Sequence, residues 1–297
     1  QLPWWWNGGT YTRGAYESLF YYDAKKKSLT RLTAAGLSVS DVQLTEDRKT
    51  VYYSLLDVSV PRPAYFGGAD LYRMELASRR EEAVAKSRPD FNIAAYALGR
   101  SFLLLLAADG KYGMNTDVDF YTLNYETLAV SPCAVYGESI GSSVGSDTRH
   151  GGGRTMKMDG DVLYFISTRF DSAGLYKLEN GVVSPVMERG GSVDCFDRCG
   201  GKMLLCALWD MRAQELYDET GARITHFNDA ALRGKYVARP EALTYTAEDH
   251  EVHGFVLKPM NFEPGKKNPV ILDVHGGPKT VYGPVFYHEM QYWAGRG

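Results

Sequence analysis

A repeating pattern of short strands most constrains what this 297-residue chain can fold into. One half of the pattern is a strand that ends in an apolar residue and a tyrosine, followed by a polar turn and another strand. The other half is a turn followed by a dense apolar strand, at 46–56, 98–109, 158–168 and 199–210. The marker tyrosines recur every 41 to 55 residues and are Tyr21, Tyr72, Tyr121, Tyr176 and Tyr217. Each period therefore holds about four short strands separated by turn residues.

Four strands per repeat of about 40–50 residues is the pattern of a β-propeller. One four-stranded sheet cannot bury both of its faces, so successive sheets must stack. We expect a partial blade at 1–33 and then four nearly complete blades at 36–85, 91–135, 139–188 and 192–228. The half-blade at the start predicts that earlier blades precede this sequence. A β-sandwich is the alternative, and the spacing of the repeat argues against it.

Composition narrows the class of partner. The net charge is −3 and the pI is about 6.1, so nothing indicates a nucleic-acid or anionic-membrane surface. The longest apolar run, 102–108, is far shorter than the ~20 residues that span a bilayer. We therefore expect no nucleic-acid partner and no membrane partner, and the cysteines described next are consistent with a cytoplasmic location. The four cysteines lack a metal-site or redox spacing and predict reduced, partly buried thiols; they are Cys133, Cys195, Cys199 and Cys206.

The repeating pattern of short strands ends near residue 235. Residues 239–259 alternate as two longer strands with a turn at 248–250. The apolar run 270–274 predicts a buried strand, and 285–295 is compatible with a helix that follows it. A strand, a turn and a helix in succession form an α/β unit.

These observations predict two domains. Residues 1–235 form a β-propeller that lacks its first blades, and 236–297 begin an α/β domain. The fold class is mainly β.

The sharpest candidate site follows the predicted strand 270–274 and consists of His275, Gly276, Gly277 and Pro278. Two glycines let a backbone turn tightly and approach a ligand closely. Their N–H groups could face a developing oxyanion, as in the Gly-Gly loops of esterases and lipases. A simple strand-ending turn is the alternative, and it would be favoured on the two glycines alone. The strand, the histidine, the proline and the paired strands upstream together favour the oxyanion loop.

A second motif matches a nucleophile elbow, and we reject it. Both 137–141 and 141–145 fit G-x-S-x-G, with Asp147 and His150 close behind. An elbow needs a buried strand before the serine and a helix after it. The Gly- and Ser-rich stretch that follows cannot start a helix. The motif is therefore expected to be an inter-blade connection.

Three further features favour structural roles. The tryptophans of 3–9 would alternate faces on a strand and are expected to pack between blades. Glu81 and Glu82 could bind a substrate amine but lie in a charged strand, so we expect a solvated edge. No histidine has a metal-binding spacing that we accept. We therefore predict no metal and no cofactor.

The chain resembles the prolyl oligopeptidase family of serine peptidases. The resemblance rests on a propeller followed by "YTAEDHEVHGFVLKP" and then "PVILDVHGGP". The His-Gly-Gly-Pro form and "SSVGSDTRHGGG" look most like the acylaminoacyl-peptidase branch. The resemblance covers essentially the whole chain; it is specific at 239–297 and diffuse over the blades.

This resemblance implies a β-propeller joined to an α/β-hydrolase domain, with the active site between them. It implies that the propeller restricts access to short peptides and that the N–H of Gly277 is an oxyanion donor, with His275 and Pro278 shaping the loop. The Ser, Asp and His of the triad would all lie after this loop, so no triad residue is assigned here. The dipeptidyl-peptidase branch holds the substrate N-terminus with a propeller glutamate pair, and Glu81 and Glu82 lack that context.

Two functions follow as hypotheses. The first is the propeller and oxyanion-loop part of a serine peptidase that cleaves short peptides or acyl-amino acids, with this chain alone inactive and a homo-oligomer possible. The alternative is a β-propeller module that binds a peptide or protein without catalysis.

Overall fold

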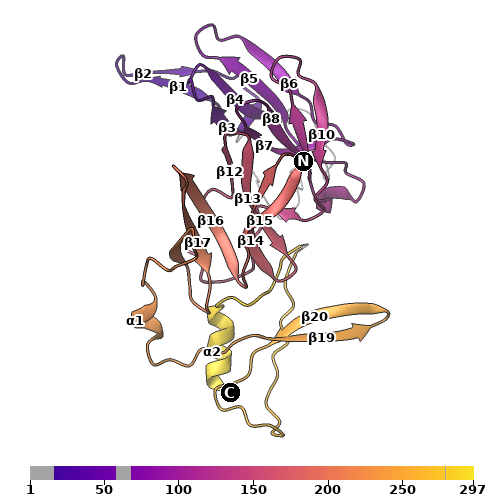
Figure 1. Ribbon diagram of the computed structural model, residues 1–297, viewed down its shortest axis with the longest axis vertical. Helices are drawn as coiled ribbons and strands as arrows, with labels where there is room; N and C mark the ends of the chain where they lie inside the picture. The colour runs from indigo at the N-terminus through magenta and orange to yellow at the C-terminus, as the bar shows by residue number, and fades with distance from the viewer. Residues whose placement is uncertain (1–16, 58–67, 278) are drawn as a thin grey trace, which may run out of the picture. The chain divides into compact units, whose positions relative to one another are not determined.

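The computed structural model describes residues 17–57, 68–277 and 279–297. The predicted tryptophan stretch 3–9 and Pro278 lie outside the described residues. The chain divides into two compact units, 1–137 and 138–297, and each is described by itself (Figure 1).

The first unit contains a two-stranded hairpin and two four-stranded antiparallel sheets. The hairpin supplies the last two strands of the predicted partial blade, and each sheet follows chain order as a propeller blade does. The hairpin is β1 (Phe20–Asp23) and β2 (Ser28–Arg31). The first sheet is β3 (Leu37–Leu44), β4 (Thr50–Asp57), β5 (Asp70–Glu75) and β6 (Glu81–Ala85). The second is β7 (Asn92–Leu98), β8 (Leu103–Ala108), β9 (Asp119–Leu123) and β10 (Val130–Ala134), with the short 3-10 helix η2 (Gly113–Asn115) between β8 and β9.

The second unit holds two more blades, joined by one parallel pairing between Ala173 and Ser192. The first strand of this blade is split, because β11 and β12 both pair with β13 and residues 141–155 loop out between them. That blade is β11 (Ser139–Ile140), β12 (Met156–Asp159), β13 (Val162–Arg169), β14 (Ser172–Glu179) and β15 (Val182–Met187). The next is β16 (Ser192–Cys199), β17 (Lys202–Leu208) and β18 (Glu215–Asp218). The predicted partial propeller is confirmed, and the strands of three blades fall within the predicted limits 36–85, 91–135 and 139–188. The blade predicted at 192–228 has three strands, which end at Asp218, and residues 1–16 of the predicted partial blade lie outside the described residues.

The marker tyrosines have one structural meaning. In each of the four blades the marker lies in the third strand, directly opposite a fully buried apolar or aromatic residue of the second strand. The pairs are Tyr72 with Tyr53, Tyr121 with Leu105, Tyr176 with Phe165, and Tyr217 with Leu205. The sequence repeat is therefore a repeat of cross-strand register.

Both faces of the second strand are buried in the first blade. In β4, Val51, Tyr53 and Leu55 enter a core that also contacts Leu19 and Leu32, the residues on either side of the β1–β2 hairpin. Tyr52 enters the core shared with the next blade. Successive side chains of a strand point to opposite faces, so a strand buried on both sides has apolar residues in succession. The dense apolar strands of the repeat are these second strands.

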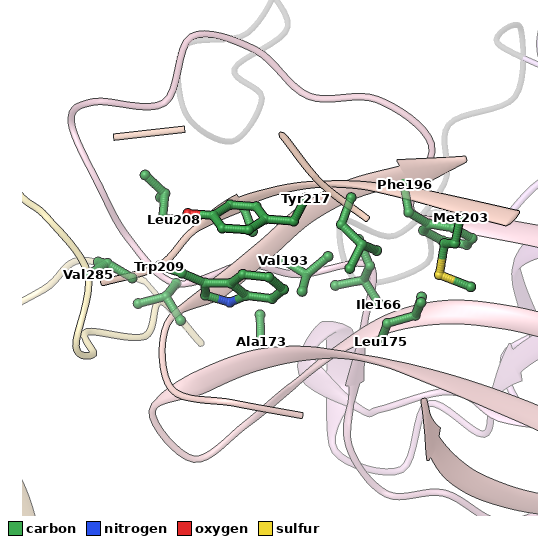
Figure 2. Packing of buried hydrophobic residues seen from close by; sticks show 13 residues of the cluster. Ile166, Ala173, Leu175, Val193, Phe196, Met203, Leu208, Trp209, Tyr217 and Val285 are labelled. Carbon is green, nitrogen blue, oxygen red and sulfur yellow. The ribbon is translucent and has the colours of Figure 1, made fainter. Parts of the chain in front are cut away.

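The core of the second unit lies between its two blades and includes Leu205 and Trp209. Two residues from outside the blades join it: Val144, from the loop between β11 and β12, and Val285, from the C-terminal segment. Figure 2 shows Val285 beside Trp209, on the ribbon that carries the C-terminal colour. The C-terminal segment is thus packed into a blade core at this point.

Residues 219–297 contain a short helix, a hairpin and a second helix: α1 (Asp229–Leu232), β19 (Glu241–Ala247), β20 (His250–Val256) and α2 (His288–Arg296). The turn of the hairpin is Glu248 and Asp249, both at positive φ (49° and 66°), as a two-residue hairpin turn requires. The predicted pair of strands and the helix are confirmed. The predicted domain boundary at 235–236 stays a prediction.

The predicted buried strand at 270–274 is wrong for this structure. These residues form no strand, and Val270, Leu272 and Val274 are 88%, 84% and 77% exposed. An apolar strand of a parallel sheet needs paired strands beside it and helices over its faces. No described residue supplies those neighbours to 270–274.

Candidate active-site loop

The candidate oxyanion loop is closed by contacts between its two flanks. The Tyr282 hydroxyl donates a hydrogen bond of 2.9 Å to Asp273 Oδ2. The ring of His275 meets the ring of Tyr282 edge-on at 5.4 Å. Burial, and then the bond to Asp273, raise the pKa of Tyr282 to about 12, so the hydroxyl stays a donor at neutral pH. Tyr282 thus ties the residue before the loop to the residues after it.

The two glycines of the loop differ in the space around them. A Cβ on Gly276 would meet nothing within 4 Å, whereas one on Gly277 would lie 3.1 Å from the amide nitrogen of Lys279. The positive φ of the turn falls at Lys279 (66°) and at neither glycine. Gly277 is therefore needed for close approach of the backbone, and His275, Gly276 and Gly277 are all exposed.

The segment that follows the loop is held by residues 141–155, which we call the insertion loop. The Gly145 amide donates to the carbonyl of Val281 at 2.7 Å, and the Ser146 hydroxyl donates to the carbonyl of Phe286 at 2.8 Å. A Cβ on Gly283 would lie 1.9 Å from the carbonyl oxygen of Asp171, in the turn between β13 and β14. The path of 281–286 is therefore fixed by backbone contacts on both sides.

Asp147 continues this attachment to the start of α2. Its Oδ1 accepts from the His288 amide at 2.6 Å and its Oδ2 from the Glu289 amide at 2.8 Å. In the sequence, Asp147 was considered only as a member of the rejected triad, and its role as a cap of α2 was not predicted. No local signal could have found it, because cap and helix are about 140 residues apart.

The other members of that motif also have structural contacts. The His150 amide donates to Gln214 Oε1 at 2.9 Å, and the carbonyl of Ser139 accepts from the Ser167 hydroxyl. Residues 141–155, all described, form no helix. The strand–serine–helix arrangement of a nucleophile elbow is not formed at this place.

A buried carboxylate anchors the insertion loop to β16. Asp194, with 1% of its side chain exposed, accepts two hydrogen bonds of 2.9 Å from the Arg149 guanidinium. It also accepts from the Ser192 hydroxyl and the Gln214 amide, both at 2.7 Å. A buried charge is tolerated when it is paired and hydrogen-bonded, and this one is both.

The remaining candidates have structural partners. Tyr53 donates its hydroxyl proton to Glu81, and Arg73 forms an ion pair with Glu82 at 2.8 Å. Both glutamates lie on β6, the edge strand of its sheet, as expected. Within the described ranges, no three His, Cys, Asp or Glu side chains gather as a metal ion would require. The helices that the structure describes are also too short or too polar to cross a membrane.

All four cysteines are free. Cys133, Cys195 and Cys206 are partly buried, as expected, but Cys199 is exposed. Cys195 and Cys206 lie directly opposite each other on β16 and β17.

Solved structures share this architecture over nearly the whole chain. An acylaminoacyl peptidase of Pyrococcus horikoshii covers 94% of the chain with a TM-score of 0.64 at 19% identity. An acylaminoacyl peptidase in complex with Z-Gly-Gly-Phe-chloromethyl ketone covers 93% with a TM-score of 0.65 at 18% identity.

The chain has the fold of the acylaminoacyl peptidases. A puromycin-hydrolyzing peptidase of Mycobacterium tuberculosis shares it too, over 90% of the chain with a TM-score of 0.65 at 15% identity. These neighbours confirm, as a fold, the resemblance to the prolyl oligopeptidase family: a partial β-propeller followed by the first elements of an α/β-hydrolase domain.

A curated protein is similar in sequence. It is described as the uncharacterized peptidase YuxL of Bacillus subtilis (strain 168), and it is 29% identical over 147 residues, or 47% of this chain. The chain spans 22% of that protein's length and 53%, 52% and 42% of the three solved chains. No protein-family model matches the chain.

Proposed function

We propose that this chain is the propeller and oxyanion-loop part of a serine peptidase that cleaves short peptides or acyl-amino acids by acyl transfer. The observation that carries the proposal is the candidate oxyanion loop together with its flanking residues Asp273 and Tyr282. It presents the exposed backbone of Gly277 in a turn that Tyr282 closes, within a chain that has the acylaminoacyl-peptidase fold.

The reaction would use this loop as follows. A serine hydroxyl attacks the substrate carbonyl while a histidine takes its proton, and the tetrahedral oxyanion accepts a hydrogen bond from the Gly277 amide. The intermediate collapses, the amine leaves with the proton from the histidine, and water then hydrolyses the acyl-enzyme. We place the Ser, Asp and His of this triad after the loop, and the propeller over the entrance to the site.

The first experiment compares labelling by a fluorophosphonate probe. We expect the longer protein that contains this chain to be labelled and the isolated 1–297 chain to remain unlabelled. Labelling of the isolated chain would overturn the proposed division of the active site. An unlabelled, inactive longer protein would favour the propeller binding module.

A second experiment tests the oxyanion donor with a matched pair of glycine variants. In the longer protein, Gly277→Ala should lower kcat for an N-acetylated amino-acid p-nitroanilide about tenfold, because a displaced donor stabilises the oxyanion less well. Gly276→Ala, whose new methyl group meets open space, should change kcat by less than about twofold. Equal losses in the two variants would contradict the assignment of Gly277.

A further inference from the structure

We propose that Asp147 is a positioning residue for the oxyanion loop. From the insertion loop of a propeller blade it fixes the start of α2, and through Tyr282 it fixes the turn that carries Gly277. The expected effect of Asp147 on catalysis rests on the proposed function. Its effect on the position of the loop backbone does not.

The cap on α2 comes from Asp147 and not from the helix's own sequence. The first amides of a helix have no partners within the helix, and Tyr287, at the N-cap position, supplies no side-chain bond. Asp147 uses both carboxylate oxygens to accept from His288 and Glu289, at 2.6 and 2.8 Å. A negative charge at this end also interacts favourably with the helix dipole.

Asp147 is itself held on both sides. Before it, the Ser146 hydroxyl donates to the carbonyl of Phe286 at 2.8 Å. After it, Arg149 makes its paired bonds to the buried Asp194 and donates to the carbonyl of Val144 at 2.6 Å. Val144 is fully buried in the blade core. The cap is therefore mounted on a rigid part of the blade.

Aromatic contacts connect the start of α2 to the candidate loop. Tyr287, next to the capped amides, meets Tyr282 edge-on at 6.1 Å. Tyr282 in turn meets His275 at 5.4 Å and donates to Asp273. Movement of the α2 start would therefore move Tyr282, whose side chain closes the turn around Gly277.

The kinetic experiment uses the longer protein and an N-acetylated amino-acid p-nitroanilide. Asp147→Ala should lower kcat about tenfold and change KM by less than about twofold, because a displaced oxyanion donor weakens transition-state binding more than substrate binding. Asp147→Asn keeps an acceptor oxygen and should recover part of the loss. Asp218→Ala is the matched control, because that carboxylate also accepts from two backbone amides, of Thr220 and Ala222, in the turn after β18.

A double variant tests the path. If Asp147 acts through Tyr282, the kcat losses of Asp147→Ala and Tyr282→Phe should not multiply when the two are combined. Losses that multiply, or a change in KM with kcat unaffected, would overturn the inference. If Asp147→Ala does not fold, Asp147→Asn replaces it. The kcat losses of Asp147→Asn and Tyr282→Phe, measured singly and combined, then test the same path.

A measurement on the 1–297 chain separates this inference from the proposed function. In Asp147→Ala, the ¹⁵N order parameters of the Gly276 and Gly277 amides should fall together with those of His288 and Glu289. They should stay unchanged in Asp218→Ala. If only the α2 amides respond, the inference is overturned even where the longer protein is active. If the longer protein is inactive, the proposed function fails and the order parameters still decide the mechanical coupling.

Discussion

The blades and the C-terminal segment 236–297 are stabilised in opposite ways. In a blade, each second strand buries its residues against neighbours that follow within about fifty residues of chain. In the C-terminal segment, β19 is exposed along its whole length and the apolar run 270–274 is exposed and unpaired. The segment is attached to the blades by a small set of contacts, which include Val285 in a blade core, Asp147 on two amides, and the ring of His253 against that of Phe170.

This difference teaches that apolar character alone does not form an element. The run 102–108 and the run 270–274 are both rich in aliphatic residues, yet only the first becomes a buried strand. In β8 the partner strands are adjacent in the chain and pair on both sides. A hydrophobic run gains stability in proportion to the surface it removes from water, and 270–274 removes little.

The largest expected effect comes from a matched pair of leucines. Leu205→Ala, at a site that is 0% exposed opposite Tyr217, should lower the free energy of unfolding by about 2–5 kcal/mol, because it leaves a cavity in the blade core. Leu272→Ala, at a site that is 84% exposed, should cost less than about 0.5 kcal/mol. Denaturant unfolding of both variants measures the contrast. Similar losses would mean that 270–274 is buried in solution.

A second effect concerns the point at which the C-terminal segment contacts the blade. Gly283→Ala places a methyl group 1.9 Å from the carbonyl oxygen of Asp171, so the backbone must shift, at a cost of about 1–3 kcal/mol. Thermal unfolding and the amide spectrum of α2 should both report the change. Gly152→Ala, where a Cβ meets no atom within 4 Å, is the control. An unchanged α2 spectrum in Gly283→Ala would argue against this contact.

A smaller effect should appear as a pH dependence at the end of the last blade. Hydrogen bonds from Arg223 and then from His226 lower the pKa of Asp229 to about 2, from 3.8. Because the pKa is lower in the folded state, the stabilisation is present above about pH 4 and is lost as the pH falls towards 2. The difference in urea midpoint between the wild type and Asp229→Asn should therefore shrink over that range. A difference that stays constant with pH would show that the ion pairs do not contribute.

The smallest effect is a difference in the alkylation rates of two cysteines, and it involves no change in stability. Burial, followed by the neighbouring Cys195 and Asp194, raises the pKa of the Cys206 thiol to about 12. Only the thiolate reacts, so iodoacetamide at pH 8 should alkylate the exposed Cys199 well before Cys206. Mass spectrometry of the modified chain distinguishes the two. Equal rates would show that β16 and β17 separate on the timescale of the reaction.

The blades could be predicted from the sequence because their order is local. Tyr72, Tyr121, Tyr176 and Tyr217 recur every 41 to 55 residues, and the structure places each at the same register position. The pattern of period two and the turns between strands depend on neighbouring residues only. The hairpin turn, predicted at 248–250 and formed by Glu248 and Asp249, could be predicted for the same reason.

The support of the candidate loop could not be predicted in this way. Asp147 and His288 are far apart in the chain, and an aspartate in a Gly- and Ser-rich stretch carries no sign of the helix it caps. The exposure of 270–274 depends on which strands lie beside it, which its own sequence does not specify. The glycines of the loop were identified, but the difference between Gly276 and Gly277 depends on where the Lys279 amide lies.

The split strand of the second unit has a consequence for how such proteins change. Since β11 and β12 both pair with β13, the hydrogen-bond ladder of the blade continues although the chain leaves it for fifteen residues. Gly151 and Gly152, within that excursion, have no atom within 4 Å of an added Cβ. Evolution or a protein engineer can therefore lengthen the chain there without altering strand register. The insertion between β11 and β12 can therefore gain new contacts while the strand pairing of the blade stays the same.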